Sequence, residues 1–211
     1  MTKLFLLLLL CSLASHCAKG QTDTDQQYQQ AVTLMEQERY SEALKLLTPL
    51  VKQTPDEFTY RQSRATCYYQ LKQFADAAFE FRILTQLVPE NTEFVFQTGN
   101  SYEQLDSLRL AVQYYSTAIQ QQPDNFLYHF KRGTVYLKQS RWSPAINDMN
   151  EVIALNKNYD NAYHNRAIAL YKAGEEMRAC NDWCRAALLG NKLSVTHLER
   201  NCKRYPFNCD K

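Results

Sequence analysis

Five alanines recur along this 211-residue chain at one constant interval. They are Ala43, Ala77, Ala111, Ala145 and Ala179. An interval this regular, without an insertion or a deletion, indicates one supersecondary structure built five times over. Stacked repeats of this kind bury a continuous core between neighbours. The interval therefore constrains the fold more than any other feature of the chain.

Three further sets of residues keep the same interval. A small residue stands twelve positions before each alanine: Ala31, Ala65, Gly99, Gly133 and Ala167. A large residue stands four positions after each: Leu47, Phe81, Tyr115, Met149 and Trp183. Small residues let the backbones of two helices come close, and large residues fill the space beside such a crossing. Prolines, which stop one helix before the next begins, close the first three intervals at Pro55, Pro89 and Pro123.

This pattern resembles that of the tetratricopeptide repeat (TPR) family, in which small, aromatic, alanine and proline positions recur at intervals of about 34 residues. The resemblance implies an all-α fold, a right-handed α-solenoid of five helix pairs. The repeats would occupy residues 24–57, 58–91, 92–125, 126–159 and 160–193. A capping helix and tail would follow at residues 193–211, because a terminal repeat otherwise leaves an apolar face uncovered. The stretch from Ala179 to Asn191 is similar to the closing repeat of exported bacterial TPR proteins.

The first twenty residues predict a secretory signal peptide, residues 1–20. Lys3 precedes an apolar run over residues 4–10, and small residues follow. The run is too short to span a bilayer, and no later segment qualifies as a transmembrane helix. Cleavage after Gly20 would release a periplasmic or secreted protein. Alternatively, Cys17 would be the lipid-anchored first residue of an outer-membrane lipoprotein.

Charge and motifs argue against several classes of function. Removing residues 1–20 takes Lys3 and Lys19 from the 24 basic residues, so 22 basic residues face 22 acidic ones. Nucleic-acid binders usually carry a basic excess, and we therefore expect no nucleic-acid partner. The sequence has no Gly-rich phosphate loop, no His-Glu-x-x-His and no Cys-x-x-Cys. We expect no enzymatic activity, no catalytic residues, no metal and no cofactor.

The TPR resemblance implies that the first helix of each repeat lines a concave groove, where a peptide or a helix of a partner protein binds. The groove positions most suited to binding are Tyr28, Tyr69, Phe96, Asn100, Phe130, Lys138, His164, Tyr171 and Lys172. Aromatic rings at these positions would anchor a ligand, or some of them would pack against the neighbouring repeat instead. Charge changes sign from Glu93 and Glu103 towards Lys131, which would orient a partner or is ordinary solvated surface.

Some TPR adaptors clamp a terminal carboxylate with a Lys and an Asn on one first helix. No repeat here has that pair; the third repeat, for example, holds Phe96 and Asn100 at the matching positions. The sequence therefore predicts a protein–protein interaction scaffold of another specificity. The alternative is a structural subunit that associates with itself, and the sequence leaves the oligomeric state open.

Cysteines gather near the C-terminus, at Cys180, Cys184, Cys202 and Cys209. In an oxidising compartment they would form disulfides that join the capping helix to the last repeat. Of the three pairings that four cysteines allow, we favour Cys180–Cys202 with Cys184–Cys209. Free thiols are one alternative, and zinc bound by these cysteines together with His197 is another. Cys67 adjoins a core position and is expected to be a small buried hydrophobe.

Overall fold

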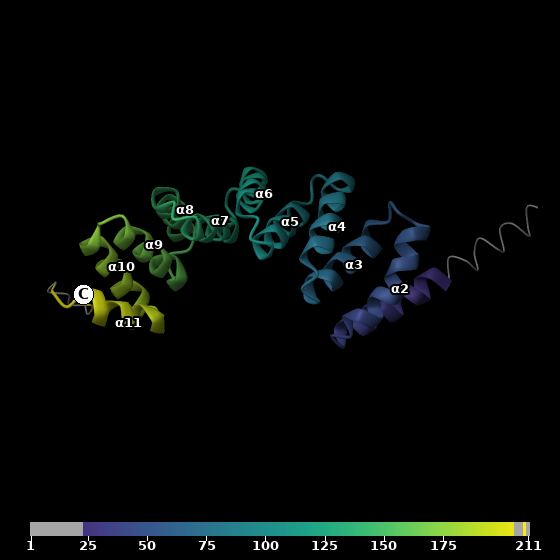
Figure 1. The fold of residues 1–211 in the computed structure, drawn as a ribbon, viewed down its shortest axis with the longest axis horizontal. Helices are drawn as coiled ribbons and strands as arrows, with labels where there is room; N and C mark the ends of the chain where they lie inside the picture. The colour runs from purple at the N-terminus through teal and green to yellow at the C-terminus, as the bar shows by residue number, and fades with distance from the viewer. Residues whose placement is uncertain (1–22, 205–208, 210–211) are drawn as a thin grey trace, which may run out of the picture. The chain divides into compact units, whose positions relative to one another are not determined.

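The computed structural model describes residues 23–204 and residue 209, and every regular element in these residues is a helix (Figure 1). The predicted signal peptide, residues 1–20, and Cys17 lie outside the described residues. The chain divides into two compact parts: an N-terminal part that ends at Glu90 and a C-terminal part that begins at Asn91. We describe each part by itself. None of the helices in the described residues is long and apolar enough to cross a membrane.

Helices of 13 or 14 residues alternate with short turns through most of the chain. The N-terminal part contains a helix over residues 23–36, then α2 (Tyr40–Gln53), α3 (Phe58–Gln70) and α4 (Phe74–Leu87). The C-terminal part contains α5 (Thr92–Gln104), α6 (Leu108–Gln121), α7 (Phe126–Lys138), α8 (Trp142–Leu155), α9 (Asp160–Lys172), α10 (Glu176–Leu188) and α11 (Lys192–Asn201). The all-α helical repeat fold expected from the constant interval is confirmed.

The recurring small residues lie where the two helices of a repeat cross. Ala43, Ala77 and Ala111 have no exposed surface, nor do the two alanines that follow at the same interval. A Cβ atom added at Gly99 would lie 2.8 Å from the Tyr115 ring, closer than real Cβ contacts allow. The glycine therefore permits the close approach of α5 and α6 that the sequence predicted.

One position of the turn between the two helices repeats in an unexpected way. The backbone adopts a positive φ at Glu38, Lys72, Asp106, Ser140 and Gly174, which keep the same interval as the alanines. Only the fifth of them is glycine, the residue that accepts this conformation without strain. Four repeats therefore place an ordinary side chain in the left-handed region because the turn demands it.

Charged pairs tie the two helices of three repeats together at a fixed separation of 16 residues. They join Arg64 to Glu80, Arg132 to Asp148 and Arg166 to Asp182, each within 2.7 Å. The acidic partners are almost completely buried. Because an unpaired buried carboxylate is costly, these arginines are part of the core rather than free surface charge.

The last helix, α11, begins at Lys192, one residue before the expected start of the capping helix. The side chain of Asn191 caps its N-terminus by accepting a hydrogen bond from the Ser194 backbone N–H. Cys202, just after the helix, belongs to the same apolar cluster as Leu170 and Trp183. The helix thus covers the last repeat, as an end cap of a repeat array does.

Candidate partner-binding face

The first helices of the repeats lie side by side in the C-terminal part of the chain. The Phe96 ring of α5 and the Tyr128 ring of α7 have centroids 4.7 Å apart, and α7 contacts α9 directly. The His164 Nδ1 atom of α9 lies 2.7 Å from the Ser194 Oγ atom of α11. We call the side of α5, α7 and α9 that carries the predicted groove positions the first-helix face; those positions are Phe96, Asn100, Phe130, Lys138, His164, Tyr171 and Lys172.

The aromatic rings of this face are held by neighbouring aromatic rings. Phe96 lies 5.6 Å from Tyr115, between centroids, as well as against Tyr128. Phe130 meets Tyr159 edge-on at 5.0 Å, and Tyr171 packs against Trp183 at 5.5 Å. All three rings of the face remain partly exposed. Each ring packs against a neighbouring ring and remains partly exposed, so the packing alternative holds for all three. Their role as anchors for a ligand stays a prediction.

Two polar positions of the predicted groove are buried. His164 is 7% exposed and is bound to Ser194, and burial, followed by the charge of His197, lowers the pKa of its imidazole. Asn100 is 8% exposed, and its side-chain oxygen lies 2.7 Å from the Tyr115 hydroxyl. The side-chain oxygen of Asn100 and the Nδ1 atom of His164 are therefore already hydrogen-bonded within the protein.

The buried carboxylate of Glu103 organises the charge of the face. Lys138 Nζ lies 2.6 Å from one oxygen of Glu103, and Lys131 Nζ lies 3.6 Å from the other. The Tyr115 hydroxyl is also within hydrogen-bond distance of this carboxylate, at 2.8 Å. Burial alone would raise the pKa of Glu103, but the bond from Lys138, the charge of Lys131 and the bond from Tyr115 together lower it. Glu103 is therefore ionised at neutral pH.

This pairing corrects the simple change of sign expected along the groove. Glu103 is 8% exposed and forms ion pairs with two lysines, so it offers no acidic surface to a partner. The side chains of Lys131 and Lys138 are 36% and 48% exposed. What the face presents to solvent near α7 is consequently basic.

An exposed leucine completes the face. Leu127 is 42% exposed and stands four residues before Lys131 on α7. Residues three, four and seven apart share one side of a helix, so Leu127, Lys131, Thr134 and Lys138 form a stripe. Lys172 on α9 is the equivalent, in the next repeat, of Lys138 on α7, and Lys172 is exposed. The stripe thus combines an apolar anchor point with cations.

The two groove positions in the N-terminal part are also partly buried. The Tyr28 ring packs against Tyr60 with centroids 4.8 Å apart, and its hydroxyl lies 3.0 Å from Ser63 Oγ. The Tyr69 ring meets Phe74 edge-on at 5.3 Å. These rings belong to first helices of their own part, where they add to its packing.

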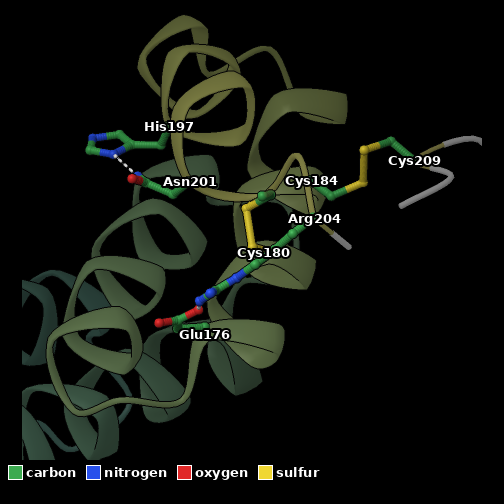
Figure 2. Close-up of a disulfide and its surroundings, with 8 residues drawn as sticks. Glu176, Cys180, Cys184, His197, Asn201, Arg204 and Cys209 are labelled. Carbon is green, nitrogen blue, oxygen red and sulfur yellow. Dashed lines mark hydrogen bonds and ion pairs between the residues drawn. A yellow bond between two sulfur atoms is a disulfide. The ribbon is translucent and has the colours of Figure 1, made fainter. Parts of the chain in front are cut away.

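The C-terminal cysteines form two disulfides, Cys180–Cys202 and Cys184–Cys209, which is the pairing favoured from the sequence (Figure 2). Figure 2 also shows Arg204, just after α11, reaching Glu176 at the start of α10. Sulfurs bonded to each other are not available to zinc. Among the residues that the structure describes, no group of three or more His, Cys, Asp and Glu side chains is placed to hold a metal ion.

Cys67 is buried and unpaired, as the sequence suggested. Burial raises the pKa of its thiol to about 11. A thiol with so high a pKa stays protonated and unreactive at neutral pH. Cys67 therefore acts as a small apolar residue in the cluster that contains Ala31 and Leu47.

Comparison with known proteins identifies the repeats. Two profiles of the tetratricopeptide repeat family match residues 28–92 and 99–140. A tetratricopeptide repeat and J domain-containing co-chaperone, DNJ1 of Fusarium oxysporum f. sp. lycopersici, is 40% identical over 65 residues, which are 31% of this chain and 12% of that protein. Human tetratricopeptide repeat protein 13 is 25% identical over 162 residues, 74% of this chain and 19% of that protein. The chain thus spans less than a fifth of the length of these relatives.

Solved structures share the fold at low sequence identity. A crystal structure of MamA superposes with a TM-score of 0.75 at 16% identity, over 88% of this chain and 96% of MamA. YrrB, described as a TPR protein with an unusual peptide-binding site, superposes with a TM-score of 0.73 at 14% identity, over 82% of this chain and 90% of YrrB. These likenesses concern the fold.

Proposed function

Because this chain belongs to the tetratricopeptide repeat family, we propose that it is a non-enzymatic scaffold that binds a segment of a partner protein along the first-helix face. The observation that carries the proposal is the stripe on α7, where the 42%-exposed Leu127 stands beside the partly exposed Phe130 and two lysines. Interfaces combine an apolar, aromatic centre with a polar rim. The structurally similar YrrB is described as having a peptide-binding site, which supports the same use of the fold here.

The rings of the face suit such a role energetically. Phe96, Phe130 and Tyr171 are fixed by their neighbours before any ligand arrives. A ligand that packs on a fixed ring loses less conformational entropy than one that must order a free side chain. We expect a bound segment to contribute apolar side chains to these rings, and truncating one such anchor to cost about 1–3 kcal/mol.

A pair of matched variants tests the proposal. Leu127 and Leu155 are both leucines with 42% exposure, but Leu155 ends α8, a second helix outside the first-helix face. We expect the wild-type protein and the Leu155→Ser variant to capture the same protein from the native cell extract. The Leu127→Ser variant should capture it about tenfold more weakly, which is the effect of losing about 1.4 kcal/mol. Equal capture by both variants would remove the first-helix face from consideration.

We include export to an oxidising compartment in the proposal, with the periplasm or the cell exterior as its site. Two disulfides in a chain of this size support it, because disulfides persist in such compartments and are rare in the cytosol. The intact mass of the protein from its native source would distinguish an N-terminus at Gln21 from a lipid on Cys17. A mass that includes residues 1–20 would contradict export.

A second candidate is a structural subunit that associates with itself. Exposed apolar side chains at the C-terminal end favour it: Leu193 is 67% exposed, Val195 44% and Leu188 54%. An end cap that leaves apolar side chains exposed can stack on another copy of the chain. Light scattering over a range of concentrations would reveal a dimer under this hypothesis and a monomer under the leading one.

A further inference from the structure

The cluster around Glu103 resembles a prepared binding site more than an ordinary ion pair. One buried carboxylate is shared by Lys138 Nζ at 2.6 Å and Lys131 Nζ at 3.6 Å, and it is supported from within by the fully buried Tyr115. Asn100, which contacts the same hydroxyl, also donates to Gln97, so the inner side of the cluster is satisfied. Both ammonium groups are therefore paired with Glu103 while their side chains stay partly exposed to solvent.

The charges do not balance. Two ammonium groups meet a single carboxylate, which leaves the cluster with a net charge of +1. Lys172 adds a second positive charge at the equivalent position of α9, and no ion pair of Lys172 is present among the described residues. Another acid of the face, Glu93, accepts a hydrogen bond from the neutral Gln97 amide and keeps its negative charge. Three lysines against these two carboxylates still leave an excess of one positive charge. An acidic ligand would supply the missing negative charge.

We propose that Lys131 and Lys138, positioned by Glu103, receive an Asp or Glu side chain of the partner segment, with Lys172 receiving the next acidic residue along it. This inference rests on the proposed function and names the chemistry of the partner: an acidic, extended segment with apolar residues between its carboxylates. Lysines held by a buried carboxylate need little further ordering when the ligand binds, so the preorganised pair gains more from a carboxylate than two free lysines would. The partner carboxylate comes from a side chain, since the Lys and Asn pair that grips a chain terminus is absent from these repeats.

Selection from a random library tests the chemistry first. A library of random peptides, displayed on phage and fused through their C-termini, offers side-chain carboxylates but no terminal ones. We expect the full-length protein to select peptides rich in Asp and Glu with interspersed apolar residues. Selection of neutral or basic peptides would overturn the inference and leave the proposed function standing. Selection of no peptide at all would count against both.

Variants of the cluster then test the residues, with one selected acidic peptide carrying a fluorescent label as the probe. Lys131→Gln with Lys138→Gln should weaken binding about tenfold. Glu103→Gln keeps the shape of the side chain and an oxygen that accepts the hydrogen bond from Lys138, so the lysines stay in place. Because the competing negative charge is gone, binding should strengthen about threefold. The opposite directions separate a binding role from a merely structural one, because damage to the fold would weaken binding in both.

Two controls complete the design. Lys45→Gln with Lys157→Gln removes two lysines outside the face and should leave the affinity unchanged within about twofold. The same peptide with Gln in place of each Asp and Glu should bind the wild-type protein at least about tenfold more weakly, and salt should weaken only the acidic peptide. A neutral peptide that binds as well as the acidic one, or a Glu103→Gln variant that binds more weakly, would overturn the assignment.

Discussion

The Cys180–Cys202 disulfide should provide much of the stability of the C-terminal cap. The cap is small: α11 has 10 residues, and Ser194 is its only buried one. The bridge closes a loop with a sequence separation of 22 residues. Closing a loop of that length in the unfolded chain lowers its entropy enough to stabilise the folded state by about 3 kcal/mol. Replacing both cysteines by alanine should remove about that amount from the free energy that keeps α11 docked.

Two measurements would detect the reduced stability of α11 in this variant. Urea unfolding, monitored by circular dichroism, should show an early loss of helix in the Cys180→Ala, Cys202→Ala variant, at lower urea than in the oxidised wild type. Hydrogen exchange should accelerate at the α11 amides by about two orders of magnitude, which corresponds to about 3 kcal/mol of local opening. The same change should appear in the wild-type protein when reductant is added.

The comparison with reductant contains its own control. Among the cysteines that the structure describes, Cys67 is already a free thiol, so reductant acts only on the two bridges there. The double variant should respond to reductant only through the Cys184–Cys209 bridge, which joins α10 to the chain beyond α11. Unchanged exchange at α11 after reduction of the wild type would refute the reasoning, because the helix would then be held by packing alone.

Two further predictions concern the repeats themselves. Lys72 has a φ of +60°, so the Lys72→Gly variant should be more stable than the wild type by about 1 kcal/mol in urea unfolding. The control Lys45→Gly, within α2, should be less stable by a similar amount. A loss of stability in both variants would show that the turn carries no strain. The Asp148 carboxylate, whose oxygen lies 3.7 Å from His129 Nδ1, raises the pKa of that imidazole, so the folded state binds the proton more tightly than the unfolded chain does. The wild type should therefore be more stable than the His129→Gln variant, with the full difference present below about pH 6.5 and lost as the pH rises through the folded-state pKa. A difference in stability that stays constant from about pH 5.5 to about pH 8 would contradict this.

The repeat fold could be predicted from the sequence because helix crossings accept only small residues. A position such as Gly99, where a Cβ would meet the Tyr115 ring, leaves a mark at every repeat. The positive φ of the turn left no such mark. Glu38 and Lys72 adopt a positive φ although neither residue type favours that conformation. Among the five turn positions, only Gly174 is a residue type from which a positive φ could be predicted. Backbone strain of about 1–2 kcal/mol is tolerated where surrounding contacts require it, so residue type alone does not reveal it.

The face was harder to predict than the fold, because exposure depends on the next repeat. Phe96 and His164 occupy equivalent positions, yet Phe96 meets a tyrosine ring of α7 while His164 is covered by α11. The role of Glu103 depends on three residues from two further helices, which no local pattern brings together. One signal was available: an arginine followed 16 residues later by an acid recurs in three repeats, as in Arg132 and Asp148, and it marks the pairs that close the core.

Site-specific crosslinking tests the central claim most directly, namely that a partner segment lies along the first-helix face. A photoreactive amino acid would replace Leu127 in one variant and Leu155 in another, since the two leucines are equally exposed. On irradiation in the native cells, we predict a crosslink to one partner protein from position 127 and none from position 155, with the crosslinked peptide of the partner rich in acidic residues. Crosslinks from position 155 alone, or from position 127 only to another copy of this chain, would contradict the claim.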